Sequence, residues 1–282
     1  MTSISDKVIL VTVEFRGCTG NKVDKAISNE VAENKSANQK ELGNFTKKLF
    51  GKFPELEQIN KFDAMQRKEI EKMTVPFSRN QHLLPSEKLM DYYRLISDIK
   101  TNREKLVKNM VDAIPGRIEA IKQSQGTAFD EGMLPTAEQM ASRFSIDHFE
   151  SMLPEKSNFE KLIGVDELIE DLQEEFDSKM ENKIGQIESH LKGLLKERLE
   201  AVRERLYNHS SDSRKVQQRV IDRTVELAKR VKELNVTNLE DIEELSNDTI
   251  NLLANLSSDV VSTVDSVRDE TVKSLDLIIG KL

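Results

Sequence analysis

One apolar stripe runs through the longest unbroken helical pattern of the chain, from about Val165 to Tyr207. This stretch contains no proline, and its apolar residues recur every three or four positions, as on one side of an α-helix. They are Ile169, Leu172, Phe176, Met180, Ile184, Ile187, Leu191, Leu195, Leu199, Val202 and Leu206. A stripe this narrow predicts a partner helix, from the same chain or from a second copy.

A returning helix is predicted after the polar turn at 208–213, because apolar residues recur at helical spacing up to Leu234. The two helices would form an antiparallel hairpin with a basic tip. The basic residues at or next to that tip are Arg203, Arg205, Arg214, Lys215 and Arg219. Residues 235–282 predict one or two further helices, starting near Thr237. Their serine, threonine and valine content suggests that they order only against a partner.

The N-terminal half mixes strand and helix patterns. Residues 7–16 are β-branched and apolar on both faces, which predicts a buried strand. Residues 144–149 alternate apolar and polar side chains and predict its partner strand. Residues 74–85 are interpreted as a loop.

Helices are predicted at 23–34, 55–73 and 86–125 in this half. The first would place Val23, Ala26, Ile27 and Val31 on one face. The last should kink or break at Pro115, because proline removes a backbone hydrogen bond and clashes with the preceding turn. Thr136 and Gln139 have the spacing of a capping box, which predicts a short helix there.

These elements predict a mainly α protein, elongated, with long antiparallel coiled-coil-like hairpins and a small two-stranded β element in the N-terminal half. The expected division has three parts. They are an α+β region at 1–160 that contains the long helix 86–125, a helical hairpin at 161–234, and an acidic helical segment at 235–282.

Composition supports long, half-exposed helices, since 33% of the residues are charged, 5% are aromatic and tryptophan is absent. A single cysteine, Cys18, excludes an internal disulfide framework and is typical of a reducing compartment. The N-terminus lacks the pattern of a signal peptide, and no apolar run reaches the roughly 18 residues of a membrane span. We therefore expect a cytoplasmic protein without a membrane partner.

Charge is distributed unevenly along the chain. Residues 235–282 carry ten acidic and three basic side chains, whereas residues 192–234 carry twelve basic and seven acidic ones. The favoured interpretation is that the two segments pair with each other. The alternative is a basic surface for an acidic partner.

No pattern predicts catalysis, a metal or a cofactor. The four histidines are scattered without zinc-ligand spacing. Gly17, Gly20 and Lys22 follow the first strand, but their spacing is not that of a phosphate-binding loop. Cys18 has no nearby histidine to activate it. We therefore expect a protein that is not an enzyme.

Several ordered blocks resemble a phage-encoded family catalogued as domain of unknown function 3150. The blocks are Phe15-Arg-Gly17-x-Thr-Gly20, Thr74-Val-Pro-Phe77, Leu83-Leu-Pro85 followed by Tyr92 and Tyr93, Phe129-Asp130, Pro135-Thr136 leading to Phe144, and Leu153-Pro154 before Phe159. They span roughly residues 8–165. The chain departs from the family at Cys18 and Phe77, where tryptophan is expected.

The resemblance implies a phage or prophage origin and brings no catalytic residues. Members of the family tend to be encoded near a MoxR-like AAA+ ATPase and a von Willebrand factor A-domain protein. The leading hypothesis is therefore a non-enzymatic adaptor, substrate or assembly factor for this ATPase in the host cytoplasm. It would self-associate through one helix seam, formed by Phe176, Ile184, Ile187, Leu191, Leu195 and Leu199.

Two alternatives stay open. One is a nucleic-acid-associated protein of phage replication or recombination that uses the basic hairpin tip as its contact surface. This alternative predicts binding that weakens steeply with salt. The other is a structural component of the virion.

Overall fold

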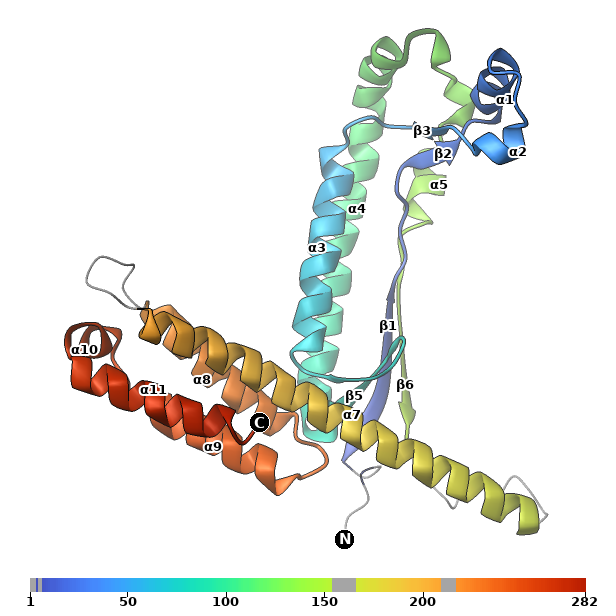
Figure 1. The fold of residues 1–282 in the computed structure, drawn as a ribbon. Coiled ribbons are helices and arrows are strands. Elements are labelled where there is room, and N and C mark those ends of the chain that lie inside the picture. Colours follow the sequence, from blue (N-terminus) through green and yellow to red (C-terminus); the bar gives the residue numbers. More distant parts are fainter. Residues whose placement is uncertain (1–3, 5–6, 154–165, 209–216) are drawn as a thin grey trace. The chain divides into compact units, whose positions relative to one another are not determined.

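A computed structural model describes residues 4, 7–153, 166–208 and 217–282 (Figure 1). The described residues are mainly helical with a small antiparallel sheet, which confirms the mainly α class. The chain forms two compact units. Unit 1 combines Met1–Thr12, Glu71–Met90 and Glu150–Leu282, and unit 2 combines Val13–Ile70 and Asp91–Phe149. Each unit is thus assembled from segments that are distant in sequence.

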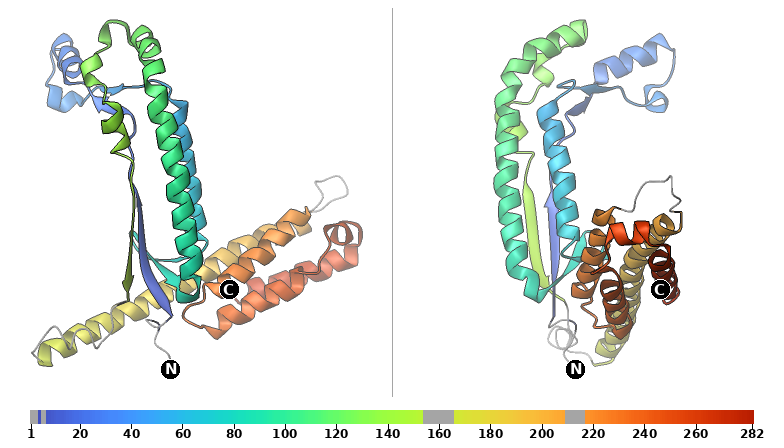
Figure 2. Two further views of the ribbon diagram at one scale, coloured as in Figure 1. Left: turned by 180° about the vertical axis from the view of Figure 1, so that it is seen from behind. Right: turned by 90° about the vertical axis from the view of Figure 1, so that its left-hand side faces the viewer.

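Unit 2 is built on two antiparallel helices, α3 (Pro54–Glu71) and α4 (Leu89–Gln125), which lie side by side in Figures 1 and 2. Both were expected. However, α4 continues through Pro115, where a kink or break was predicted. The core of this unit gathers apolar side chains from both helices and from the segments on either side. It comprises Leu49, Phe50, Phe53, Leu56, Ile59, Met110, Ile114, Ile121 and Met140.

Unit 2 also contains three short helices, and the first of them buries a different face from the one predicted. Its short helices are α1 (Lys25–Asn34), α2 (Gln39–Leu42) and α5 (Ala137–Ala141). The expected inward face of α1 was wrong. Ser28 and Ala32 are buried, whereas Val31 is exposed. Asp24 sets the start of α1, because its side chain accepts a hydrogen bond of 3.1 Å from the Ile27 amide, so Val23 lies outside the helix.

Two further features of unit 2 depend on backbone hydrogen bonds. Strands β2 (Asn21–Val23) and β3 (Thr46–Lys48) pair antiparallel and were not predicted. The capping box at the start of α5 is confirmed, because Thr136 and Gln139 exchange side-chain to backbone hydrogen bonds of 3.0 and 3.2 Å. The box sets the start of that helix.

The main sheet has the strand order β4-β5-β1-β6. Its members are β1 (Val8–Phe15), β4 (Val75–Ser78), β5 (Gln81–Pro85) and β6 (Ile146–Met152). The prediction that the first strand pairs with the segment near 144–149 is confirmed by the adjacency of β1 and β6. The predicted loop at 74–85 was wrong, because it forms β4 and β5.

The extra strands were missed because their pairing partner is remote in sequence. Val8 of β1 lies opposite Pro85, and Val11 lies opposite His82, in antiparallel register. Prolines normally argue against a strand, but Pro76 is tolerated because β4 is an edge strand.

The C-terminal part of unit 1 is a helical bundle. Its helices are α7 (Asp166–Tyr207), α8 (Gln218–Glu233), α9 (Glu240–Leu253), α10 (Ser258–Thr263) and α11 (Asp265–Ile279). Among them α7, α8, α9 and α11 alternate in direction, and α9 and α11 pack on both α7 and each other (Figure 1). The acidic segment is therefore ordered against its own chain, as three helices where one or two were expected.

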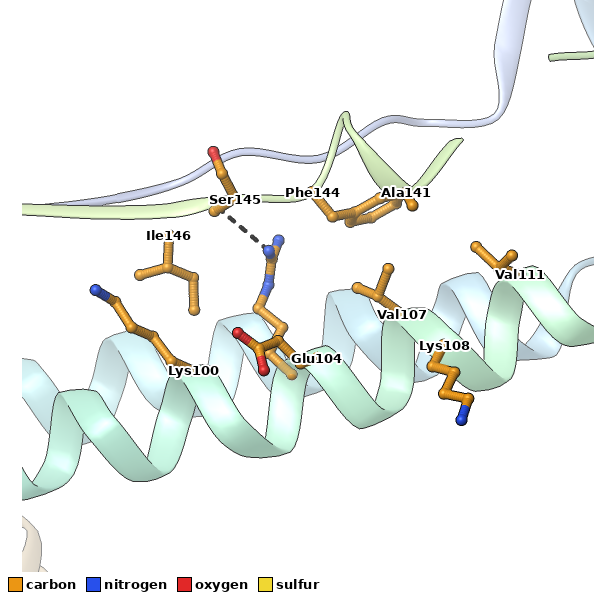
Figure 3. Close-up of a pocket in the computed structure, with 10 residues that line it drawn as sticks. Lys100, Glu104, Val107, Lys108, Val111, Ala141, Phe144, Ser145 and Ile146 are labelled. Carbon is orange, nitrogen blue, oxygen red and sulfur yellow. Dashed lines mark hydrogen bonds between the residues drawn. The ribbon is translucent and has the colours of Figure 1, made fainter. Parts of the chain in front are cut away.

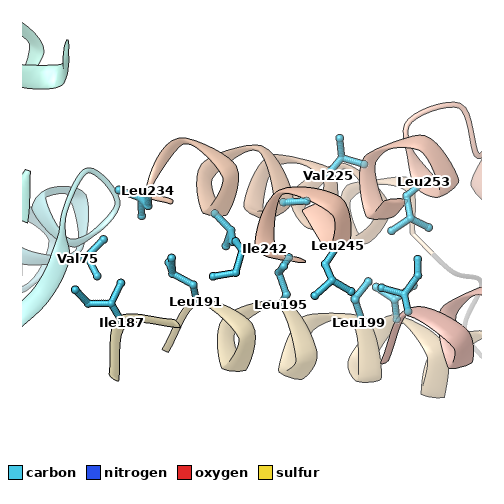
Figure 4. Close-up of a cluster of buried hydrophobic side chains, with 14 of the residues drawn as sticks. Val75, Ile187, Leu191, Leu195, Leu199, Val225, Leu234, Ile242, Leu245 and Leu253 are labelled. Carbon is cyan, nitrogen blue, oxygen red and sulfur yellow. The ribbon is translucent and has the colours of Figure 1, made fainter. Parts of the chain in front are cut away.

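Figure 4 shows how this bundle buries the stripe of α7. Leu191, Leu195 and Leu199 point toward side chains of α8 and α9, including Ile242 and Leu245 of α9, whereas Ile187 lies beside Val75 of β4. Because three helices cover the stripe, its buried half belongs to a multi-helix core rather than to a two-helix seam.

Candidate interaction surfaces

Arg103 of α4 is the centre of a buried polar cluster in unit 2. Its Nε and Nη2 donate to Asp63 of α3 at 2.8 and 2.9 Å, which makes a two-point ion pair. Its Nη2 also donates to the Arg16 carbonyl at 2.6 Å, and its Nη1 donates to the Ser145 carbonyl at 3.2 Å. One guanidinium thus ties both helices to the ends of the two neighbouring strands.

Aromatic rings enclose the same guanidinium. Its carbon lies 5.9 Å from the ring centroid of Phe15 and 5.5 Å from that of Phe144. A Cβ atom at Gly17 would approach Phe144 to 3.3 Å, so glycine permits this close packing. Three residues from the blocks of the family resemblance therefore meet around Arg103, and they do so as packing residues.

A groove of about 620 Å³ opens along α4 beside this cluster (Figure 3). Its walls are mainly apolar, and Lys100, Glu104 and Lys108 supply its charged side chains. The lining comprises Lys100, Arg103, Glu104, Val107, Lys108, Val111, Ala141, Phe144, Ser145 and Ile146. Arg103 adds no free positive charge here, because Asp63 neutralises it.

The predicted seam residues of α7 fall into two groups. Ile187, Leu191, Leu195 and Leu199 are buried in the bundle of their own chain. Phe176 and Ile184, in the first half of the helix, remain partly exposed. The sequence pattern could not separate the two groups, since periodicity is the same along the whole stripe.

The predicted hairpin-tip residues are likewise divided. Arg203 forms an ion pair within the chain, because its Nε donates to Asp276 of α11 at 2.8 Å. Its guanidinium also lies 5.4 Å from the Tyr207 ring centroid. Arg205 and Arg219 are exposed. Arg214 and Lys215 lie outside the described residues.

The structure shows the expected pairing between the basic and acidic segments at three places. Lys192 bridges Asp241 and Glu188, each at 2.7 Å. The hydrogen bond to Asp241 is the main reason why the pKa of Lys192 is raised above its usual value, and the bond to Glu188 adds to the effect. Lys232 pairs with Glu243 at 3.3 Å, and Arg203 pairs with Asp276. Part of the positive charge of α7 and α8 is thus balanced within the chain.

Arg198 reveals a group of cations that this pairing does not balance. Its Nε donates to Thr224 Oγ1 of α8 at 3.3 Å. Burial lowers the pKa of Arg198, and the charges of Arg205 and Arg223 lower it further. Arg198 and Arg223 were not predicted as contact residues because they lie along the hairpin and not at its tip. Their seven-residue and four-residue spacings from Arg205 and Arg219 are the signal that could have found them.

The histidines and possible metal ligands of the described ranges 7–153, 166–208 and 217–282 lie apart from one another. No group of three or more potential ligands converges there. His148 Nδ1 lies 3.0 Å from Lys100 Nζ, and His82 Nδ1 lies 3.4 Å from Thr74 Oγ1. Nor is any helix of these ranges long and apolar enough to cross a bilayer.

No protein-family model, curated protein or solved structure matches this chain. The resemblance noted in the sequence therefore stays a prediction, and the surfaces above have to be interpreted from their own chemistry.

Proposed function

We propose that this chain is a non-enzymatic interaction protein that pairs with a second copy through the first half of α7. The observation that supports the proposal is a mismatch in helix length. Helix α7 has 42 residues, whereas α8, α9 and α11 have 16, 14 and 15. At about 1.5 Å per residue, the shorter helices span only 21–24 Å of a helix about 63 Å long.

Burial along α7 follows this mismatch. Its buried stripe runs from Ile187 to Leu206, and the first half extends past the ends of α8, α9 and α11 (Figure 2). Met180 and Ile184 continue the stripe into this half, where Met180 packs partly against the core of its own chain and Ile184 stays partly exposed. A narrow apolar stripe of this spacing is covered best by another long helix.

A second copy is the occupant that the stripe favours, because it presents an equally long helix with the same apolar spacing. Residues 166–183 carry eight acidic and two basic side chains, and Glu175 and Lys179 among them form an i,i+4 pair at 2.5 Å. This acidic surplus makes two copies repel each other at low salt, so we expect the self-association to strengthen as salt screens the charges. The proposed pairing is coiled-coil-like and would give an elongated assembly.

The partner beyond this self-association is proposed from the resemblance alone. It implies an adaptor, substrate or assembly factor for a phage MoxR-like AAA+ ATPase and its von Willebrand factor A-domain neighbour.

Light scattering after size-exclusion chromatography tests the self-association. We expect Ile184→Asp to convert the oligomer to monomer, because it places a charge in the exposed stripe. Ser189→Asp is the matched control, since it adds the same charge at an exposed position of the same helix. A wild-type monomer, or identical behaviour of the two variants, contradicts the proposal.

A pull-down from phage-infected cells, with and without nuclease, tests the wider role. Recovery of an ATPase regardless of nuclease supports the adaptor function. Failure to recover an ATPase, or loss of the ATPase on nuclease treatment, contradicts it.

A further inference from the structure

We propose that one side of the α7–α8 pair binds the phosphodiester backbone of nucleic acid through Arg198, Arg205, Arg219 and Arg223. This site is separate from the exposed half of α7 and does not depend on self-association. It differs from the predicted hairpin-tip surface, because Arg203 is paired with Asp276 and the centre of the site lies farther along the helices.

The hydrogen bond from Arg198 to Thr224 shows that these two residues lie at the same height along the axes of α7 and α8. The helices run in opposite directions, so Arg223 lies beside Arg198. Arg205, seven residues further along α7, lies within about one turn of Arg219 on α8. The four guanidinium groups therefore form two levels separated by about 6–10 Å along the helix axes.

The charge of this group is not compensated inside the described part of the chain. Arg205, Arg219 and Arg223 are exposed, and none has a carboxylate partner there. The nearby carboxylate of Asp222 instead accepts a hydrogen bond of 2.9 Å from Gln218. By contrast, Lys192, Arg203 and Lys232 are each paired with the acidic helices.

Mutual repulsion within the group makes a bound anion favourable. Arg198 is partly buried and bonded to a neutral hydroxyl, and its lowered pKa reflects burial together with the charges of Arg205 and Arg223. An anion placed between these cations would replace repulsion by attraction. Arginine is well suited to this, because its planar guanidinium donates two parallel hydrogen bonds to a phosphate.

The spacing of the four arginines fits a chain of several phosphate groups better than a single phosphate ion. A nucleic-acid strand with one phosphate per about 3.4 Å of duplex axis places two or three phosphates over the two levels. Among the described residues of the site, Tyr207 supplies the one aromatic ring, and Arg203 lies over it. Without a platform of several aromatics, the site would hold the backbone and not read bases.

Fluorescence anisotropy with a labelled 30-base-pair DNA duplex, titrated over a salt series, tests the site. We expect Arg205→Gln/Arg223→Gln to weaken binding about tenfold or more and to reduce the salt slope by about two. Both positions are exposed, so the variant should fold as wild type does. The matched control is Arg79→Gln/Arg94→Gln, which removes the same charge at exposed arginines elsewhere and should change the affinity less than about twofold.

Three outcomes would overturn the assignment. They are no binding of the wild-type protein at about 100 mM salt, equal losses in the two double variants, and displacement of the duplex by inorganic phosphate at matched ionic strength. The last would indicate a site for free phosphate. Ile184→Asp should bind the duplex as wild type does, so failure of the self-association proposal is distinguishable from failure of this one.

Discussion

Arg103 of α4 and Asp63 of α3 form a buried two-point ion pair, with hydrogen bonds of 2.8 and 2.9 Å. The pair joins two residues that are 40 positions apart in sequence, and the same guanidinium donates to two backbone carbonyls. Its position makes it the main polar connection in unit 2.

We predict that Asp63→Ala lowers the free energy of unfolding by about 3–5 kcal/mol, because it leaves the Arg103 charge buried without its partner. Urea denaturation would measure the change. The double variant Asp63→Leu/Arg103→Met removes both charges and should recover part of the loss. A loss below about 1 kcal/mol in the single variant would contradict a buried ion pair.

Two glycines should respond to alanine in opposite directions. Gly193 lies within α7 with open space at its Cβ position, so Gly193→Ala should raise the free energy of unfolding by about 0.5–1 kcal/mol. Gly20 has a φ of +68° and its Cβ would lie 3.2 Å from Leu56 Cδ2, so Gly20→Ala should be destabilising. Urea midpoints of the two variants would check the signs. Equal signs would contradict the assigned backbone conformations.

His82 should make stability depend on pH. Burial lowers its pKa, and the charge of Glu71 opposes this only in part. The folded state therefore binds fewer protons at this site than the unfolded state. The stability from His82 is complete above the unfolded pKa of about 6.5 and is lost as the pH falls through the lower folded-state pKa.

Unfolding free energies at pH 7.5 and pH 5 would measure this loss. We expect His82→Gln to reduce the difference between the two values, because glutamine does not titrate. His190→Gln, at an exposed position of α7, serves as the control and should keep the wild-type difference. An unchanged difference in His82→Gln would show that other groups cause the acid sensitivity.

The bundle core should be sensitive to truncation at Leu195, which is fully buried. We predict that Leu195→Ala lowers the free energy of unfolding by about 2–5 kcal/mol, through lost burial and the remaining cavity. Leu277→Ala is the matched control in α11, where the leucine is 72% exposed, and should cost less than about 0.5 kcal/mol. Similar losses for both would contradict the packing of the bundle.

Local patterns were enough to predict much of the fold. The periodicity of residues 165–207 predicted α7 almost to its ends, because a long helix repeats the same signal many times. The capping box at Thr136 was predicted because its hydrogen bonds join residues three apart. The adjacency of β1 and β6 followed from the need of a buried strand for a partner.

The remaining features depend on contacts between distant segments. Strand β5 forms because β1 lies beside it, about 70 residues away in sequence, and its own pattern is too short to predict it. The roles of Arg103 and Arg198 were not visible in the sequence, since Asp63 and Thr224 reach them only after the helices pack. The candidate surfaces are therefore mostly a product of packing.

The sequence by itself determined that α7 has one apolar stripe. It also determined that a basic segment, residues 192–234, precedes an acidic one, residues 235–282. Both properties are local. Only the tertiary structure decided that the stripe is buried from Ile187 onward and left partly exposed at Ile184. The physical reason is length, since the 14 to 16 residues of α8, α9 and α11 cannot cover the 42 residues of α7.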